Sequence, residues 1–486
     1  MGPLAHLVMF AWIPLVFYFF SRYPAQRAIV ISFIIAETFL PNAKYSLPGF
    51  PDYSKASAAG YAVLLATICF DPQRLNSFKF SWIDIPALVY SVISPFASSI
   101  TNGLGAYDGL SQTLATSVLW GGPYFLGRLY LSDLEGLRQL AIGILMSVVV
   151  YSPLCLYETR FAPMLHKNIY GFFAHPSGIS QAIRYGGYRP MVFMYHGLWV
   201  GVWMMGGTLA AIWLWRTGVI KKLWNIPMNL LVLGLLVIFV LLKSTGAWVL
   251  AAIGIAVLFV GNFFRTSLTL LALAFYISFS LYNSAMGNVD IDKTISSMSR
   301  FFGPDRLQSL QFRMEMEEHI TEKARQRIVF GWGGFGRNRV YDYNWAGELV
   351  DITVTDSWWG IVFGVNGSVG LISGVAIRLL PVAVFCLRYP AKTWSNPKVA
   401  PTAVLAVVIC LWMYDSLLND MKSAVFLLGC GGLAGLVLKP VNLEENNKKL
   451  SGAGESKTQI SMIERQRKTY KRWHQRQQAK KRTLLK

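Results

Sequence analysis

The sequence predicts an all-α, polytopic membrane protein, and two observations carry that prediction. Of its 486 residues, 54% are hydrophobic and only 14% are charged, which is about half of the ~25% charged residues usual in soluble domains. The apolar residues also gather in blocks about as long as a bilayer-spanning helix requires. They do not follow the polar and apolar alternation of membrane-barrel strands. Together these observations exclude an ordinary soluble enzyme.

About 12 to 13 transmembrane helices are expected. The apolar blocks cover about residues 4–20, 27–41, 57–71, 82–100, 110–130, 136–157, 191–215, 226–243, 246–263, 266–285, 358–387, 401–417 and 422–438. The second and third blocks are short, so a count of twelve stays open beside thirteen.

Lysine and arginine in the short loops predict which loops face the cytoplasm. The chain after Lys439 is strongly basic, so the C-terminus is expected to be cytoplasmic. Counting back along thirteen spans, the cytoplasmic loops hold Arg22, Arg27, Arg74, Lys79, Arg128, Arg138, Arg216, Lys221, Lys222, Arg265, Arg388, Lys392 and Lys398. The same count places the N-terminus and two long segments, 158–190 and 286–355, outside.

This topology divides the chain into five expected parts. They are N-terminal transmembrane helices (1–190), central transmembrane helices (191–285), a long extracytoplasmic loop (286–357), C-terminal transmembrane helices (358–440) and a basic cytoplasmic tail (441–486). Within the long loop, Leu307, Leu310, Met314 and Ile320 recur near helical spacing with charged residues between them. That pattern predicts an amphipathic helix over 306–328 on the outer face of the bundle.

Much of the net charge of +20 lies in the chain after Lys439. A basic segment just beyond a membrane helix favours anionic lipid at the cytoplasmic surface, and we expect no nucleic-acid partner. The five cysteines all lie in apolar blocks without a CxxC pair, so they are interpreted as small buried side chains.

The sequence does not support a dinucleotide site or a metal site. The segment Gly331–Gly336 fits GxGxxG, but no strand and helix frame it as a dinucleotide site requires. We interpret it as a tight glycine turn that brings the backbone close to the interface or a ligand. The six histidines show no HExxH spacing or Cys/His cluster, so neither a metal nor a cofactor is expected.

Several cations stand at predicted outer helix ends. Arg189 precedes the block 191–215, Lys243 ends the block 226–243, and Arg313 lies on the outer helix with Arg300 nearby. One interpretation is snorkelling at the membrane interface. The other is a pocket for an anionic group, because arginine grips phosphate oxygens as a two-pronged fork.

Asp356 enters the long apolar block 358–387. A carboxylate there suits a helix N-terminus, or it acts as a general base facing an outer cavity. Gly360, Gly364, Gly367 and Gly370 follow at spacings that allow close helix packing. Arg378, deeper in the block, must face protein or water instead of lipid.

Four segments, taken in this order, resemble the bacterial O-antigen ligase and O-antigen polymerase superfamily. They are Arg189–His196, Lys243–Trp248, the pair Ser309–Arg313 with Phe330–Gly336, and the pair Asp356–Gly360 with Gly367–Gly370. In the second segment Thr245 stands where the family has arginine, and Lys243 supplies a cation from a shifted position. The family's ligases carry a histidine where this chain has Asp356, which favours the polymerase-like members.

The resemblance implies a metal-independent, inverting glycosyltransferase in the bacterial inner (plasma) membrane. Its donor would be an undecaprenyl-pyrophosphate-linked oligosaccharide, used to build O-antigen or exopolysaccharide with possible polysaccharide-assembly partners. Arg189, Lys243, Arg300 and Arg313 would bind the pyrophosphate, with Arg313 and Asp356 catalytic. His196, Gly333, Gly336 and Trp358 would lie close to the substrate.

Two other functions stay open at this point. One is a flippase or transporter of an anionic lipid or glycan, which would favour ionisable residues deep in several helices. The other is a non-catalytic scaffold of an envelope-assembly complex that docks through its basic tail.

Overall fold

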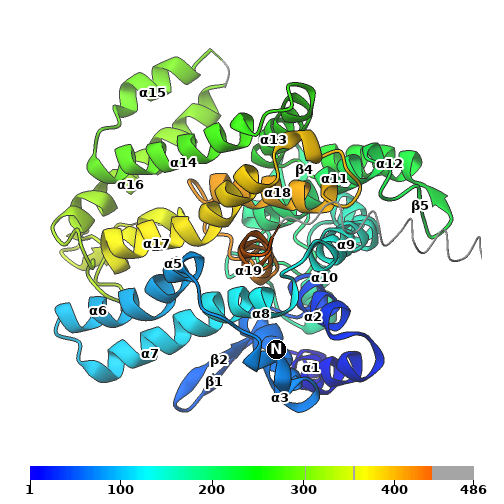
Figure 1. Ribbon diagram of the computed structural model, residues 1–486. Helices are drawn as coiled ribbons and strands as arrows, with labels where there is room; N and C mark the ends of the chain where they lie inside the picture. Colours follow the sequence, from blue (N-terminus) through cyan, green and yellow to red (C-terminus); the bar gives the residue numbers. More distant parts are fainter. Residues whose placement is uncertain (301–302, 354–355, 441–486) are drawn as a thin grey trace, which may run out of the picture. The chain divides into compact units, whose positions relative to one another are not determined.

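The structure, a computed structural model, describes residues 1–300, 303–353 and 356–440 and is predominantly helical (Figure 1). Seven helices in this part are long and apolar enough to cross a membrane, so the prediction of an all-α, multi-pass membrane protein is confirmed at that level. The described residues do not include the basic tail 441–486, Thr355 or the side chain of Arg306.

The N-terminal third begins with four helices and a hairpin. These are α1 (Pro3–Arg22), α2 (Ala25–Phe39), the antiparallel strands β1 (Lys44–Leu47) and β2 (Phe50–Ser54), α3 (Lys55–Phe70) and the short α4 (Pro72–Asn76). Pro24 separates α1 from α2 because it forces the preceding residue, Tyr23, into extended backbone.

The next two predicted spans are helices interrupted by π-helical turns. The first is η1 (Trp82–Asp84), α5 (Ile85–Leu88), η2 (Val89–Ile93) and α6 (Ser94–Thr101), and the second is α7 (Ala106–Thr116), η3 (Ser117–Gly121) and α8 (Gly122–Tyr130). Pro95 and Pro123 follow the two turns and lack the N–H that a regular helix would use. The carbonyl of Ser91, four residues before Pro95, instead accepts a hydrogen bond from the Ser117 hydroxyl at 3.2 Å.

The middle of the chain alternates long helices with short connections. It contains α9 (Leu134–Phe161), α10 (Leu165–Tyr170), η4 (Ser180–Ala182), β3 (Ile183–Arg184), β4 (Gly187–Tyr188), α11 (Gly197–Arg216), β5 (Lys222–Leu223), β6 (Ile226–Pro227), α12 (Met228–Leu241), α13 (Thr245–Phe263) and α14 (Leu268–Met286). The strands pair only as small antiparallel hairpins.

The C-terminal part holds α15 (Ile291–Met298), α16 (Pro304–Arg325), β7 (Tyr341–Tyr343), β8 (Leu349–Asp351), α17 (Trp358–Arg388), η5 (Ala391–Thr393), α18 (Ala400–Asp415) and α19 (Ala424–Leu438). Helices α18 and α19 are almost wholly buried, as is α11. Glycines bring α8 and α19 into backbone contact, since a Cβ on Gly127 would collide with the carbonyl of Leu428 and one on Gly431 with that of Tyr124.

The connections between helices segregate to two ends of the bundle. One end, called here the loop-rich end, contains the N-terminus and the segments 40–54, 102–105, 162–196, 287–357 and 416–423. Contacts that join parts of this end include Gly2 with Tyr170, Lys55 with Phe193 and Asn102 with Gly331. At the other end, Gln26 contacts Tyr130 and Ala391 contacts Ser267. These contacts agree with the predicted alternation of loops, while the side of the membrane that each end faces stays a prediction.

Helix α16 is present where the long loop was predicted to be helical, but the expectation of an amphipathic helix is wrong. Its apolar residues do not gather on one face. Met314 shares a concave surface with Glu317, Glu318 and Thr321, because charged residues occupy positions three and four residues further along the helix. The face that packs on the protein is therefore mixed.

Helix α17 is broken at Gly367, whose backbone is at φ 63° and ψ −162°. Residues 328–333 insert there: Trp332 N–H donates to the Gly364 carbonyl at 2.8 Å, and Ser368 N–H donates to the Ile328 carbonyl at 2.7 Å. A Cβ on Gly331 would lie 2.6 Å from the backbone nitrogen of Gly367. Gly331 therefore does bring two backbones close together, but its neighbour is helix α17 and not the predicted interface or ligand.

Candidate functional site

Arg313 is the centre of a cluster of charged side chains at the loop-rich end. Its Nη2 lies 3.4 Å from Oδ2 of Asp356, and its Nη1 donates to the carbonyl of Leu418 at 3.3 Å. The guanidinium is 31% exposed and the carboxylate 46%. The ion pair is therefore open to solvent and accessible to a ligand.

Glu317 lies one helical turn beyond Arg313 and belongs to the same cluster. Burial raises the pKa of its carboxyl to about 7, against the opposing effects of a hydrogen bond with Ser357 and of the positive charge of Arg313. The negative charge of Asp356 adds to the rise in pKa. Glu317 is consequently a carboxyl that gains or loses its proton near neutral pH.

The segment before α11 brings Arg189 and His196 together. His196 caps α11, because its Nδ1 accepts a hydrogen bond from the Leu198 N–H at 3.0 Å, and its Nε2 pairs with Oε1 of Gln181 at 2.9 Å. Arg189 is buried and its side chain packs against Gly197. The two expected site residues therefore flank the same helix start.

Electrostatics link these two groups of residues. The pKa of His196 is lowered to about 4, first by burial and then by the charges of Arg189, His175, Arg184 and Arg313. The neutral imidazole adds no charge of its own at neutral pH. Three arginines around a neutral histidine make this region suited to an anionic ligand.

Lys243 lies on the rim of the same region. It has an unusual positive φ of 54°, and its ammonium rests against Gly187 of the β3–β4 hairpin, 3.4 Å from the carbonyl of Tyr185. The hairpin also supplies Arg184. Lys243 thus joins the segment that carries Arg189.

Four other expected residues lie elsewhere. Arg300 is exposed after α15, and no hydrogen bond or ion pair links it to the cluster within the described part of the chain. A Cβ on Gly333 would touch Asn102 and Leu104, and one on Gly336 would touch Tyr341. These glycines shape the insertion into α17 and make no described contact with Arg313.

Trp358 was expected near the substrate, but the structure buries it to 1% exposure. Its indole lies 4.0 Å from the guanidinium of Arg378, which also lies over Trp120 and Trp412 at 4.8 and 4.2 Å. The Trp358 indole packs inward because three indole faces together stabilise the buried guanidinium of Arg378. Trp358 therefore supports the site from within.

Sequence inspection did not single out Glu317 or Asp415. Asp415 is buried and lies in the electrostatic field of Arg313. One of its oxygens accepts a hydrogen bond from Asn419 at 2.9 Å, and the other has no hydrogen-bond partner within residues 1–300, 303–353 and 356–440. Spacing alone could have flagged Glu317, since it lies four residues after Arg313. No such signal links Arg313 to Asp415.

No group of three or more His, Cys, Asp or Glu residues suited to a metal ion occurs among the described residues. What the cluster offers instead is a set of cations beside carboxylates of different basicity. Such a set can bind a phosphate-like anion and move a proton beside it.

Comparison with known proteins adds no family: no protein-family model matches the chain, and no curated protein matches its sequence.

Proposed function

We propose that the chain is a membrane glycosyltransferase that polymerises or ligates undecaprenyl-pyrophosphate-linked oligosaccharides. The observation that carries this proposal is the accessible Arg313–Asp356 pair, with Arg189 and His196 within electrostatic reach. A cation held by a carboxylate is ready to exchange that partner for a phosphate oxygen. The carboxylate that it leaves is then free to accept a proton.

The proposed step is a direct displacement. The acceptor hydroxyl oxygen attacks the anomeric carbon of the donor sugar, and the bond from that carbon to the pyrophosphate oxygen breaks. The hydroxyl proton passes to Asp356, and lipid pyrophosphate leaves with the bonding electron pair. Arg313 and Arg189 stabilise the negative charge that develops on the leaving group.

Glu317 adds a second role to this scheme. Its carboxyl is close enough to Arg313 for the two charges to interact. When protonated it leaves Arg313 free for the pyrophosphate, and when ionised it competes for the same cation. The donor site would thus bind best while Glu317 is neutral.

The broken helix α17 bears on the transporter alternative. Transporters often direct the ends of broken helices at their cargo. Here residues 328–333 occupy both sides of the break through backbone hydrogen bonds. The break therefore offers no free helix ends, which favours the enzyme over a transporter of an anionic lipid or glycan.

The envelope glycan ladder of a strain that carries Arg313→Ala tests the proposal. We expect normal protein levels, loss of long polymer and accumulation of lipid-linked single repeats if the enzyme is a polymerase. Intact polymer left on its lipid carrier would identify a ligase instead.

Arg138→Ala is a matched control, because Arg138 is similarly exposed and pairs with Glu135 at 3.3 Å at the other end of the bundle. Its ladder should equal that of the wild type. A wild-type ladder in Arg313→Ala as well would remove the basis of the proposed mechanism.

A further inference from the structure

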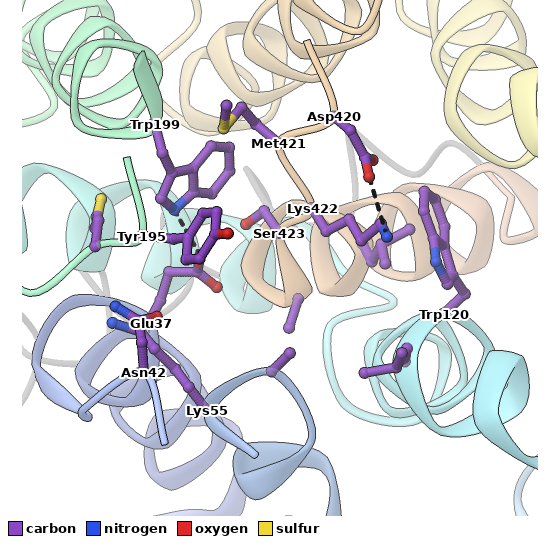
Figure 2. A pocket seen from close by; sticks show the side chains of 15 residues that line it. Glu37, Asn42, Lys55, Trp120, Tyr195, Trp199, Asp420, Met421, Lys422 and Ser423 are labelled. Atoms are coloured by element: carbon purple, nitrogen blue, oxygen red, sulfur yellow. Dashed lines mark hydrogen bonds and ion pairs between the residues drawn. The ribbon is translucent and has the colours of Figure 1, made fainter. Parts of the chain in front are cut away.

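A cavity of about 340 Å³ opens beside the charged cluster (Figure 2). It lies between the end of α2, the start of α3, the π-helical turn η3, the segment 194–199 and the α18–α19 connection. Its size is within the ~300–1,000 Å³ usual for small-molecule sites. Nothing in the proposed transfer step uses it.

Four charged side chains line this cavity from opposite sides. Figure 2 shows Glu37 and Lys55 on one wall and the Asp420–Lys422 ion pair, with an N–O distance of 3.1 Å, on the other. The two acids balance the two bases. Because each wall is neutral as a whole, the cavity suits an uncharged polar ligand better than an anion.

The polar atoms are held in place by the surrounding backbone and side chains. Glu37 accepts from the Trp199 indole N–H at 2.9 Å and from the backbone of Ala424, while Lys55 donates to the Phe193 carbonyl at 2.6 Å. One oxygen of Asp420 is buried and has no hydrogen-bond partner among the described residues. A hydroxyl group of a ligand would satisfy that oxygen.

Aromatic rings complete the lining. Trp120, Tyr195 and Trp199 reach the cavity from η3 and from the segment before α11. Aromatic faces combined with carboxylates, ammonium groups and an amide from Asn42 match the two surfaces of a sugar ring, which has apolar C–H faces and a rim of hydroxyls.

Two segments of the chain connect the lining of the cavity to the cluster around Arg313. Tyr195 precedes His196, and the His175 ring lies 4.8 Å from Tyr195 and 5.6 Å from His196. On the other side, Asp420 follows two residues after Leu418, whose carbonyl binds Arg313. A ligand in the cavity is therefore placed next to the proposed pyrophosphate site.

We propose that this cavity binds an uncharged, hydroxyl-rich sugar ring and that this ring belongs to the acceptor glycan. The identification as acceptor rests on the proposed function, whereas the sugar site rests on the lining alone. Glu37 and Asp420 accept hydrogen bonds from the ring hydroxyls, Lys422 and Lys55 donate to them, and Tyr195 or Trp199 covers a face of the ring.

Saturation-transfer NMR on the purified full-length protein in detergent tests the site, with methyl glucoside as the neutral probe and glucuronate as the acidic one. We expect saturable binding of methyl glucoside, little binding of glucuronate, and affinity for the glucoside weakened about tenfold or more by Glu37→Gln. Glu135→Gln, an exposed glutamate at the other end, should change nothing.

Lys422→Ala is the second variant, since its ammonium is 53% exposed and its loss leaves the packing intact; it should also weaken binding. No saturable binding of methyl glucoside, preference for glucuronate, or binding that neither variant weakens would each overturn the sugar site.

The test also separates the two proposals. Arg313→Ala should leave glucoside binding unchanged, because that residue belongs to the donor site. Glucoside binding in a protein without transferase activity would refute the proposed function and leave the sugar site standing. Transfer of glycan by a protein that binds no glucoside would do the reverse.

Discussion

Arg313 and Arg378 show two different ways in which this bundle holds a guanidinium. Arg313 is 31% exposed and paired with a carboxylate. Arg378 is 1% exposed, surrounded by three tryptophans, and hydrogen-bonded to Ser416 at 3.0 Å. Its Nε has no hydrogen-bond partner in the part of the chain that the structure describes. The first arginine is available to a ligand, and the second is part of the core.

The difference between these two arginines shows that a cation in an apolar chain is not by itself a sign of a binding site. Indole faces replace the hydration of Arg378, and the packed rings leave no room for a substrate. Arg313 keeps one side open and has a partner that a phosphate group can displace. For these two arginines, accessibility distinguishes the functional residue from the structural one.

The largest effect is expected from Arg378→Ala. The substitution leaves a cavity between Trp120, Trp358 and Trp412 and removes three cation–π contacts, so stability should fall by on the order of 3 kcal/mol or more. Thermal unfolding of the detergent-solubilised protein measures the loss. Arg313→Ala should barely move the midpoint, since an exposed pair contributes ~0–1 kcal/mol; equal losses would break the comparison.

A second effect concerns the joint between the two regions. Gly367 separates the start of α17, next to Asp356, from the part that carries Arg378. Gly367→Ala should cost about 1–3 kcal/mol for the backbone conformation alone, and more because its Cβ would collide with the Val329 carbonyl. Gly234→Ala in α12, where a Cβ meets open space, is the control; a stable Gly367→Ala protein would show that the insertion is dispensable.

The smallest predicted effect is a dependence on pH at the exposed arginine. Glu317 has a pKa of about 7, so it is neutral below that pH and negative above it. Raising the pH from 6 to 8 should raise the KM for the lipid-linked donor by roughly fivefold. The reason is that ionised Glu317 competes with the phosphate for Arg313 and weakens donor binding by about 1 kcal/mol.

Glu317→Gln should give a flat KM over the same range. The raised pKa of Glu317 also affects stability. Glu317 binds its proton more tightly in the folded protein than a glutamate with the ordinary pKa of 4.5 does. Stability from this group is therefore present at low pH and is lost as the pH rises from about 4.5 to 7. A KM that falls with pH, or a dependence that survives in Glu317→Gln, would assign the titration to another group.

Much of the fold follows from patterns that sequence alone displays. Each predicted apolar block is helical over most of its length, because a chain in lipid must satisfy its backbone internally. Arg378 was predicted to face protein or water instead of lipid, and it faces protein. The Arg313–Asp356 contact joins a cation predicted on the outer helix to the carboxylate predicted at the start of the block 358–387.

Other features depend on contacts between distant segments. Helix α16 packs on α14 and α17 with a face that mixes apolar and charged residues. The spacing of its apolar residues carries no information about these two partner helices. The family resemblance placed Trp358 near the substrate, yet Trp358 packs inward on Arg378, twenty residues later in the chain. The cavity is assembled from five separate segments, none of which carries a recognisable motif.

The central claim is best tested in proteoliposomes that contain the purified protein and the lipid-linked oligosaccharide isolated from the host's own membranes. We predict that the wild type lengthens or transfers the glycan and releases undecaprenyl pyrophosphate. Arg313→Ala should be slower by about 10²–10³-fold, while Arg138→Ala keeps the wild-type rate. No transfer by the wild type, or an equal rate in Arg313→Ala, would contradict the account.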